Sequence, residues 1–445
     1  MTDRPAAAAL LAQHPLRAIV ALAAPTTAVM LFAALSNILH VYFVSRLGED
    51  AIAAVSLVFP ITMIMITVVS GGLGTGVASS IARALGAGRG GDARALAEHA
   101  NAITLSLAAG GTLASELGAR GLFSLMGGDG AVLEQAVLFA RVLFGGLLIS
   151  FSVGTFDAIL RGAGNVRVPA LCSTLSLLLQ IALTPVFMFT FDLGLVGAPL
   201  ATLVGQAIGL IPRARFIFGA RSPVQPRLLP RNLRAHHFAE ILRVGVPASM
   251  SAALTYVGLV VLTGTVARFG TAHLAAYGLG SRLDFLLFSL GFGVAAGAMT
   301  LVGMATGAGR RDLIPGYVGQ ACLVAAAVVA LPAMLVTWHP ALWIGLFSAA
   351  PEVERIGTAY FHRMGPTYVF VVTSMVIGSA FQAFARAIVP LAVTVARVAL
   401  VVGGGLAAVH YGRVGAETVF TIIAGGNVVS CLVLMWLFRR AVASG

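Results

Sequence analysis

The chain has 445 residues, of which 59% are hydrophobic and 10% are charged, against roughly 25% charged residues in an average soluble domain. With a mean hydropathy of +0.97, this composition excludes a soluble globular protein and indicates an integral membrane protein. The net charge of +12 comes from arginines spread over short segments between apolar runs. Because they form no single basic patch with interleaved aromatic residues, nucleic-acid binding is not expected.

The N-terminal segment and the cysteines exclude two further classes of protein. The uncharged run from Ala18 to Ser45 is too long for the apolar core of a signal peptide, so we interpret it as the first membrane span. Cys172, Cys322 and Cys431 stand singly in apolar segments without CxxC spacing. They indicate neither a disulfide framework nor a zinc site.

Twelve stretches of the chain carry few or no charges over about 20 residues, the length that a helix needs to cross about 30 Å of hydrocarbon. Their approximate limits, in chain order, are 17–44, 52–81, 94–115, 135–160, 168–189, 196–218, 241–267, 273–304, 314–338, 356–384, 388–409 and 416–438. We therefore expect an all-α polytopic membrane protein with twelve transmembrane helices.

The arginines are distributed unevenly over the segments between these stretches. Most lie in the N-terminal segment, in every second loop and at the C-terminus, and the alternate loops hold few, including Arg46, Arg120, Arg268 and Arg413. Basic residues resist translocation across the membrane. Both termini are therefore expected on the cytoplasmic side, as an even number of spans requires.

An internal repeat relates the two halves of the chain. The segment "SRLGEDAIAAVSL" from Ser45 matches "ARFGTAHLAAYGL" from Ala267, and at the same offset Pro25 falls on Pro247. The motifs "GAGR" and "LFS" also recur in the same order in each half. Because each half has six helices, both enter the membrane in the same sense, which predicts two six-helix lobes related by a parallel pseudo-two-fold repeat, as in secondary transporters.

A segment rich in proline and arginine separates the halves, from Pro212 to Arg234. We place the N-terminal lobe, with helices 1–6, at residues 1–218. A cytoplasmic linker follows at 219–240, and the C-terminal lobe, with helices 7–12, at 241–445.

These features together resemble the multidrug and toxic compound extrusion (MATE) family of transporters. The resemblance is carried by the repeated Arg-x-Gly with Ala-Ala behind it, the two "GAGR" loops, "ILRGAGNVRVP" from Ile159, "AYGLGSRLDFLLF" from Ala276 and "GLFSAAPEVERIGTAYFHRM" from Gly345. It covers nearly the whole chain. It implies a bacterial inner-membrane protein that exports amphipathic, often cationic, molecules in exchange for protons or sodium, with alternating access between two lobes.

Two aspartates inside the predicted spans are candidates for function, because an ionisable group in hydrocarbon costs at least about 2.5 to 3.5 kcal/mol. Asp157 precedes Arg161 by one helical turn. It is therefore either half of an intrahelical ion pair or a protonatable carboxylate facing the cavity of the N-terminal lobe.

Asp284 follows Arg282 by two positions, which points the two side chains apart. Its alternatives are the binding of a cationic substrate or a proton, and a hydrogen-bonded packing site.

In the MATE family, cation chemistry of the N-terminal lobe is associated with an aspartate on the first helix and an Asn and Asp pair on the fifth. Aligned on neighbouring motifs, these positions fall on His40, Gln180 and Thr184, so the chain departs from the family at all three. Gln180 and Thr184 share a helix face, and Asn37 adjoins His40. Since a proton needs one titratable group and histidine titrates near neutrality, we predict a cation-coupling site of His40, Asp157, Gln180, Thr184 and Asn37 that favours protons over sodium.

Pro25 and Pro247 hold equivalent places in the first and seventh predicted helices. Proline removes a main-chain hydrogen bond and bends a helix, and in a membrane neighbouring groups can satisfy the freed carbonyl. A bend that switches during transport and a static helix start both account for these residues.

The leading hypothesis is a secondary active multidrug exporter, a cation antiporter. The alternative is a flippase for lipid-linked saccharides of the same broad superfamily, against which the count of twelve spans argues. An intramembrane enzyme ranks last, because the chain has no HExxH or GxSxG motif and no P-loop lysine.

We expect no enzymatic activity, no metal and no cofactor beyond a proton or sodium gradient. The expected partners are a small-molecule substrate and the lipid bilayer, with no nucleic acid, and the protein is expected to be a monomer.

Overall fold

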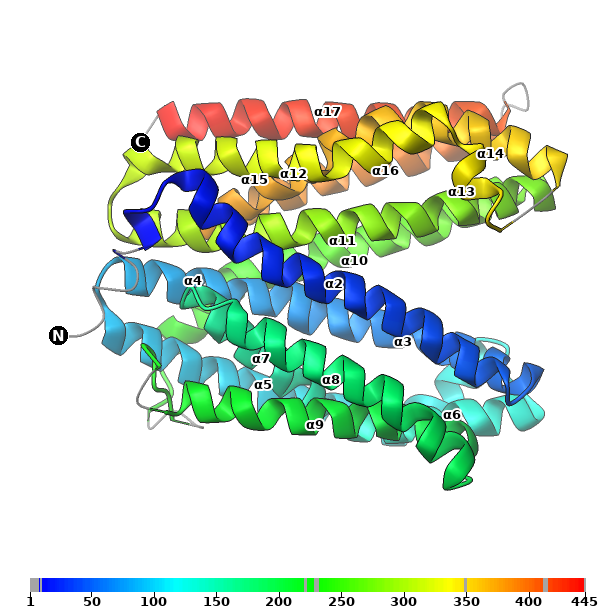
Figure 1. Ribbon diagram of the computed structural model, residues 1–445, viewed down its shortest axis with the longest axis horizontal. Coiled ribbons are helices and arrows are strands. Elements are labelled where there is room, and N and C mark those ends of the chain that lie inside the picture. Colours follow the sequence, from blue (N-terminus) through cyan, green and yellow to red (C-terminus); the bar gives the residue numbers. More distant parts are fainter. Residues whose placement is uncertain are drawn as a thin grey trace. The chain divides into compact units, whose positions relative to one another are not determined.

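The computed structural model describes residues 8, 10–219, 222–227, 232–347, 350–410 and 415–443, and every regular element within these ranges is a helix. The first half holds α2 (Pro15–Ser45), α3 (Glu49–Ile66), η1 (Thr67–Leu73), α4 (Gly74–Gly86), α5 (Gly90–Leu125), α6 (Gly130–Gly145), α7 (Leu147–Gly162), α8 (Arg167–Pro185), η2 (Val186–Thr190), η3 (Gly194–Val196) and α9 (Gly197–Ile217). The second half holds α10 (Ala235–Ala267), α11 (Thr271–Gly307), η4 (Arg311–Leu313), α12 (Ile314–Trp338), α13 (Ala341–Ile344), α14 (Pro351–Met364), η5 (Gly365–Thr367), α15 (Tyr368–Ala383), α16 (Ile388–His410) and α17 (Ala416–Ala443) (Figure 1).

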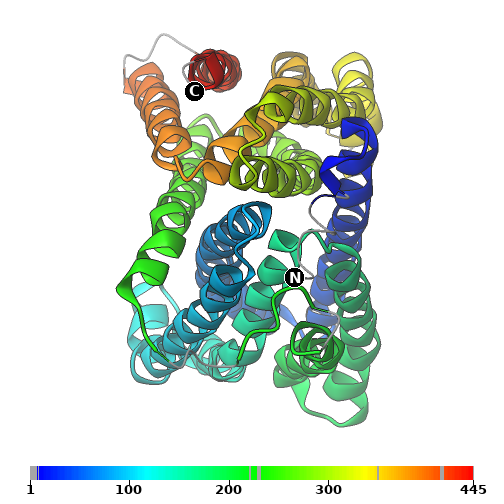
Figure 2. The same ribbon diagram turned by 90° about the vertical axis from the view of Figure 1, so that its left-hand side faces the viewer.

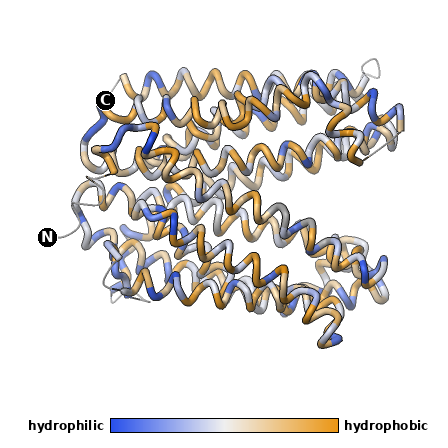
Figure 3. Tube along the Cα trace, viewed as in Figure 1, coloured by the Kyte–Doolittle hydropathy of each residue, from blue (hydrophilic) through white to orange (hydrophobic). Residues whose placement is uncertain are grey.

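The helices have the lengths and the composition of membrane spans. Ten helical segments of the described chain are long and apolar enough to cross a membrane, and α6 and α7, bent by 47° where they meet, count as an eleventh when taken together. The predicted span at 94–115 lies in α5, a helix of 36 residues, and completes the twelve. Figure 3 shows the pattern that a bilayer requires, with hydrophobic residues along the middle of the helices and hydrophilic ones gathered toward their ends.

The chain packs as two compact units. Unit 1 contains Ala28–Ser249, and unit 2 contains Ala8–Thr27 and Met250–Gly445. The long helices α2 and α10 are therefore each divided, just beyond Pro25 and just beyond Pro247. The packing assigns the first part of α2 to unit 2 and the first part of α10 to unit 1, whereas the predicted lobes follow the chain order. The predicted boundaries at the linker stay a prediction.

Unit 1 is built from neighbouring helices joined by an apolar core. Within it α3 packs against α6, α4 against α7, and α8 against α9. Its core includes Phe123, Phe144, Phe151 and Met188. Figure 2 views these helices nearly end on and shows them running alongside one another.

Unit 2 is organised around α11, which packs against α12, α14 and α15, while α16 packs against α17. Its core is aromatic, with Tyr317, Phe361, Phe381 and Phe420 almost completely buried. The segment that precedes α2 also lies here, since the Tyr317 hydroxyl donates a hydrogen bond to the carbonyl of Leu11 at 3.1 Å.

Pro25 lies inside α2, and Pro247 lies inside α10. Neither residue begins a helix, so a static helix start does not explain the pair. A bend at each proline remains a prediction, now placed where the two helices pass from one unit to the other.

Candidate functional site

The carboxylate of Asp284, on α11, is held by two tyrosine hydroxyls. Tyr360 of α14 donates to Oδ2 at 2.8 Å, and Tyr368, the first residue of α15, donates to Oδ1 at 2.5 Å. Both tyrosines are buried, with exposed fractions of 1% and 0%. Within the described chain no basic residue pairs with Asp284. A charged group in a membrane-spanning helix thus has neutral donors on both of its oxygens.

A glycine lets Tyr360 reach Asp284. Gly280 precedes Asp284 by one helical turn, so both lie on the same face of α11. A Cβ atom at Gly280 would lie 2.2 Å from Cε1 of Tyr360, a distance at which the ring would have to move. Tyr277 and Phe420 pack against the same ring, with centroid distances of 5.9 Å and 5.1 Å. The position of the Tyr360 hydroxyl is therefore fixed by packing.

Arg282 takes no part in this arrangement. Its guanidinium lies over the ring of Phe347, 5.7 Å from the centroid, as expected for two residues on opposite sides of a helix. Of the two interpretations of Asp284, the structure contains the hydrogen-bonded carboxylate.

The second buried aspartate, Asp157 on α7, forms an ion pair with Arg213 of α9. Nε of Arg213 donates to Oδ1 at 2.7 Å, and Nη2 donates to Oδ2 at 3.4 Å. The remaining donors of the guanidinium bind the carbonyl of Gly209 at 2.8 Å and the hydroxyl of Ser173 at 2.6 Å. The Arg213 side chain is completely buried. This network joins α7, α8 and α9.

Arg213 is a partner that the sequence analysis missed. The predicted span 196–218 contains Arg213, but nothing in the sequence pairs it with Asp157; α9 ends at Ile217 and carries Arg213 within unit 1. Arg161, the predicted partner, interacts electrostatically with both Asp157 and Arg213. The planar guanidinium of Arg213 provides the two-pronged contact that fits a carboxylate. The hydrogen-bonded ion pair of Asp157 is thus formed with Arg213 of another helix, whereas the prediction was an intrahelical pair with Arg161.

His40 lies on α2 without a partner on one of its ring nitrogens. Its Nδ1 atom is buried and forms no hydrogen bond with the described part of the chain, while the side chain of Asn37 is exposed. Asp157 accepts hydrogen bonds from Arg213. The structure, as far as it is described, does not bring His40 and Asp157 together.

Gln180 and Thr184 lie one turn apart on α8, as predicted. The hydroxyl of Thr184 donates to the main-chain carbonyl of Gln180 at 2.6 Å, and Thr184 is buried with an exposed fraction of 1%. The hydroxyl of Thr184 thus bonds to the main chain of its own helix. That helix, α8, continues as the π-helical segment η2 immediately after Pro185.

A further intramembrane charge, Arg397, lies in the middle of α16. Its Nη1 atom donates to the side-chain carbonyl of Asn427 on α17 at 3.1 Å, and the part of the chain that the structure describes contains no carboxylate paired with it. Arg397 is the single charged residue between Ile388 and Val409. That isolation in an apolar run was a signal available in the sequence, because intramembrane charges mark functional positions.

Comparison with known proteins gives a consistent set of relatives. The sequence model of the MatE family matches residues 25–186 and again residues 247–409, two matches that begin at Pro25 and at Pro247. The chain is 25% identical over 406 residues to the FAD transporter of Shewanella oneidensis, covering 85% of this chain and 87% of that protein. It is 24% identical over 336 residues to the multidrug export protein MepA of Staphylococcus aureus, covering 74% and 72%.

A solved structure shares the whole fold. The outward-facing conformation of a multidrug resistance MATE family transporter superposes with a TM-score of 0.92 and 27% identity, covering 98% of each chain. The predicted arrangement of twelve helices in two lobes is confirmed by this match, and the double match of the family model agrees with the internal repeat.

Proposed function

The chain belongs to the MATE family, whose members are membrane transporters rather than enzymes, and we propose that it exports amphipathic small molecules across the bacterial inner membrane in exchange for protons. Transport would proceed by alternating access, with both termini in the cytoplasm. The observation that carries the proposal is Asp284, a carboxylate in a membrane-spanning helix that is hydrogen-bonded by two tyrosines and has no basic partner among the described residues.

The energetics of Asp284 suit a group that gains and loses a proton. An ionised carboxylate in hydrocarbon costs at least about 2.5 to 3.5 kcal/mol, and each hydrogen bond to a charged group returns about 1.5 to 3 kcal/mol. These opposing amounts are similar, so the charged and neutral forms lie close in free energy. A cationic substrate beside the carboxylate favours the charged form, and its departure favours the protonated form. Asp284 can therefore exchange a bound cationic substrate for a proton.

His40 is proposed as a second proton-handling group. Its buried Nδ1 atom has no partner among the residues that the structure describes, and a buried polar atom without a partner carries an energetic cost that a structural residue normally avoids. Asp157 is left out of this role, because its charge is already matched by Arg213. A proton site at His40 therefore acts without the predicted pairing.

Expression in an efflux-deficient bacterial host tests the proposal. The wild type should raise tolerance to cationic amphipathic compounds, and Asp284→Asn at equal membrane abundance should abolish that protection. Asp312→Asn is the matched control, since Asp312 is exposed and paired with Arg310 at 2.8 Å outside this cluster. Protection by Asp284→Asn equal to that of the wild type would overturn the proposal.

A second candidate substrate class is anionic. Arg397 places a positive charge inside unit 2 with no carboxylate partner among the described residues, and a relative similar over most of its length is an FAD transporter. The diphosphate of FAD is an anion that a guanidinium binds well. Arg397→Gln should then reduce export of FAD while leaving tolerance to cationic compounds unchanged. Arg363→Gln, which removes an arginine paired with Glu417, is the control.

A further inference from the structure

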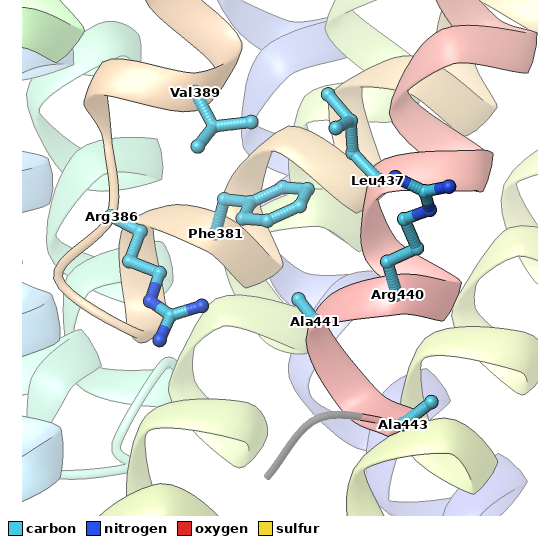
Figure 4. Close-up of a pocket in the computed structure, with 7 residues that line it drawn as sticks. All are labelled: Phe381, Arg386, Val389, Leu437, Arg440, Ala441 and Ala443. Carbon is cyan, nitrogen blue, oxygen red and sulfur yellow. The ribbon is translucent and has the colours of Figure 1, made fainter.

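Unit 2 carries an open cleft of about 580 Å³ between the end of α15, the start of α16 and the C-terminal end of α17. We call it the α15–α17 cleft. Apolar side chains form one part of its wall, namely Phe381, Val389, Leu437 and Ala441. Arg386 and Arg440 form the basic part, and Figure 4 shows them on opposite sides of the Phe381 ring, one from the turn after α15 and the other from α17.

The two arginines bring positive charge that the cleft does not neutralise. Arg386 is fixed by its main chain, whose amide donates to the carbonyl of Phe381 at 2.9 Å. The guanidinium of Arg440 lies over the ring of Trp436, 3.8 Å from its centroid. Across the described ranges neither arginine is paired with a carboxylate. An anion entering the cleft would therefore meet two guanidinium groups whose hydrogen-bonding capacity is not taken up by acidic residues.

The surroundings place the cleft at the level of the membrane surface. Trp436 is half exposed, and exposed apolar residues precede it on α17, among them Val429 and Leu432. Tryptophan collects at the interface between hydrocarbon and headgroups, and arginines near helix ends extend toward that interface. The cleft lies at the C-terminal end of α17, the side that the arginine distribution predicts to be cytoplasmic.

We propose that the α15–α17 cleft binds the headgroup of an anionic phospholipid from the cytoplasmic leaflet. The lipid phosphate would accept hydrogen bonds from Arg386 and Arg440, since guanidinium and phosphate match in charge and geometry. The upper part of an acyl chain would lie against Val389 and Leu437. A basic pocket between transmembrane helices is a recurrent site for such headgroups. A zwitterionic lipid fits less well, because its ammonium group adds positive charge beside the arginines.

The expected selectivity follows from the two arginines. A basic residue near an anionic surface contributes about 1 kcal/mol, which corresponds to about a fivefold change in affinity. Loss of one arginine should weaken binding of phosphatidylglycerol about fivefold, and loss of both should weaken it by about twentyfold or more. Binding of phosphatidylcholine should change little in either variant.

The test is native mass spectrometry of the purified full-length protein with phosphatidylglycerol or phosphatidylcholine added at matched concentrations. The variants are Arg386→Gln, Arg440→Gln and their combination. Arg439→Gln is the matched control, because Arg439 is exposed on the same helix end and does not line the cleft. Ala441→Trp keeps every charge and fills the cleft, so it separates a shaped site from diffuse attraction to a basic surface.

The proposal expects phosphatidylglycerol binding to fall in Arg386→Gln, Arg440→Gln and Ala441→Trp and to persist in Arg439→Gln. Excess glycerol 3-phosphate should displace little of the lipid, because it lacks the acyl chain. Equal binding of the two lipids would overturn the proposal, as would an equal loss in Arg439→Gln and Arg440→Gln. Full displacement by glycerol 3-phosphate would instead identify a site for soluble phosphates and would also overturn it.

Discussion

Replacement of Arg213 by methionine should destabilise unit 1 more than any change at an exposed arginine. The substitution leaves the Asp157 carboxylate without its hydrogen-bonding guanidinium partner, because Arg213 supplies the contacts at 2.7 Å and 3.4 Å. It also frees the carbonyl of Gly209 and the hydroxyl of Ser173. Since the Arg213 side chain is completely buried, water does not replace these bonds.

Arg213→Met should lower both the free energy of unfolding and the Tm. Removing one partner of a buried ion pair costs about 3 to 5 kcal/mol. For a unit of this size each kcal/mol shifts the midpoint of thermal unfolding by about 2 to 4 °C. The Tm of Arg213→Met should therefore fall by roughly 6 to 20 °C. The double variant with Asp157→Leu should regain most of that loss, because a buried ion pair replaced by apolar residues is often nearly neutral.

The assay is thermal unfolding of the purified protein in detergent, followed by the fraction that remains monodisperse after heating. Arg215→Met is the control, because Arg215 is exposed on the same helix, α9. A Tm of Arg213→Met equal to that of Arg215→Met would refute the reasoning. A double variant no more stable than Arg213→Met would show that the loss comes from packing rather than from the carboxylate that has lost its Arg213 hydrogen bonds.

Single substitutions test the tyrosine contacts of Asp284 and the predicted bend in α2. Gly280→Ala should displace the ring of Tyr360 and lower export. The control Gly278→Ala should leave export unchanged, because an added Cβ there meets no atom within 4 Å. Equal export by the two variants would exclude the close contact between position 280 and Tyr360. Tyr368→Phe removes one donor, so proton-driven export in proteoliposomes should fall about tenfold, the equivalent of about 1.4 kcal/mol. Pro25→Ala should restore a main-chain hydrogen bond and slow export at equal expression, and an unchanged rate would leave Pro25 with no role in switching.

The helices and the repeat could be predicted from the sequence because their signals are local. An apolar stretch of sufficient length identifies a span by itself, and the recurrence of motifs around Pro25 and Pro247 identified the halves. The family model matches the chain from these same two prolines. Charges within a helix weaken such a signal, which is why α5 is predicted as a shorter span, 94–115, than the helix of Gly90–Leu125.

The partners of the intramembrane aspartates could not be predicted in the same way. Arg213 follows Asp157 by 56 positions, and Tyr360 and Tyr368 follow Asp284 by 76 and 84. Only the folded chain brings these residues together, and helical spacing indicated just the intrahelical neighbour of Asp157. The division of α2 between the two units is likewise a property of packing, which no local pattern encodes.

Proton movement driven by substrate tests the central claim most directly. Proteoliposomes that hold a pH-sensitive dye are given a cationic substrate from outside in sodium-free buffer. The account predicts that the internal pH rises as substrate enters and protons leave, that Asp284→Asn abolishes this rise, and that Asp312→Asn preserves it. An unchanged rise in Asp284→Asn, or a rise that appears only when sodium is present, would contradict proton exchange at Asp284.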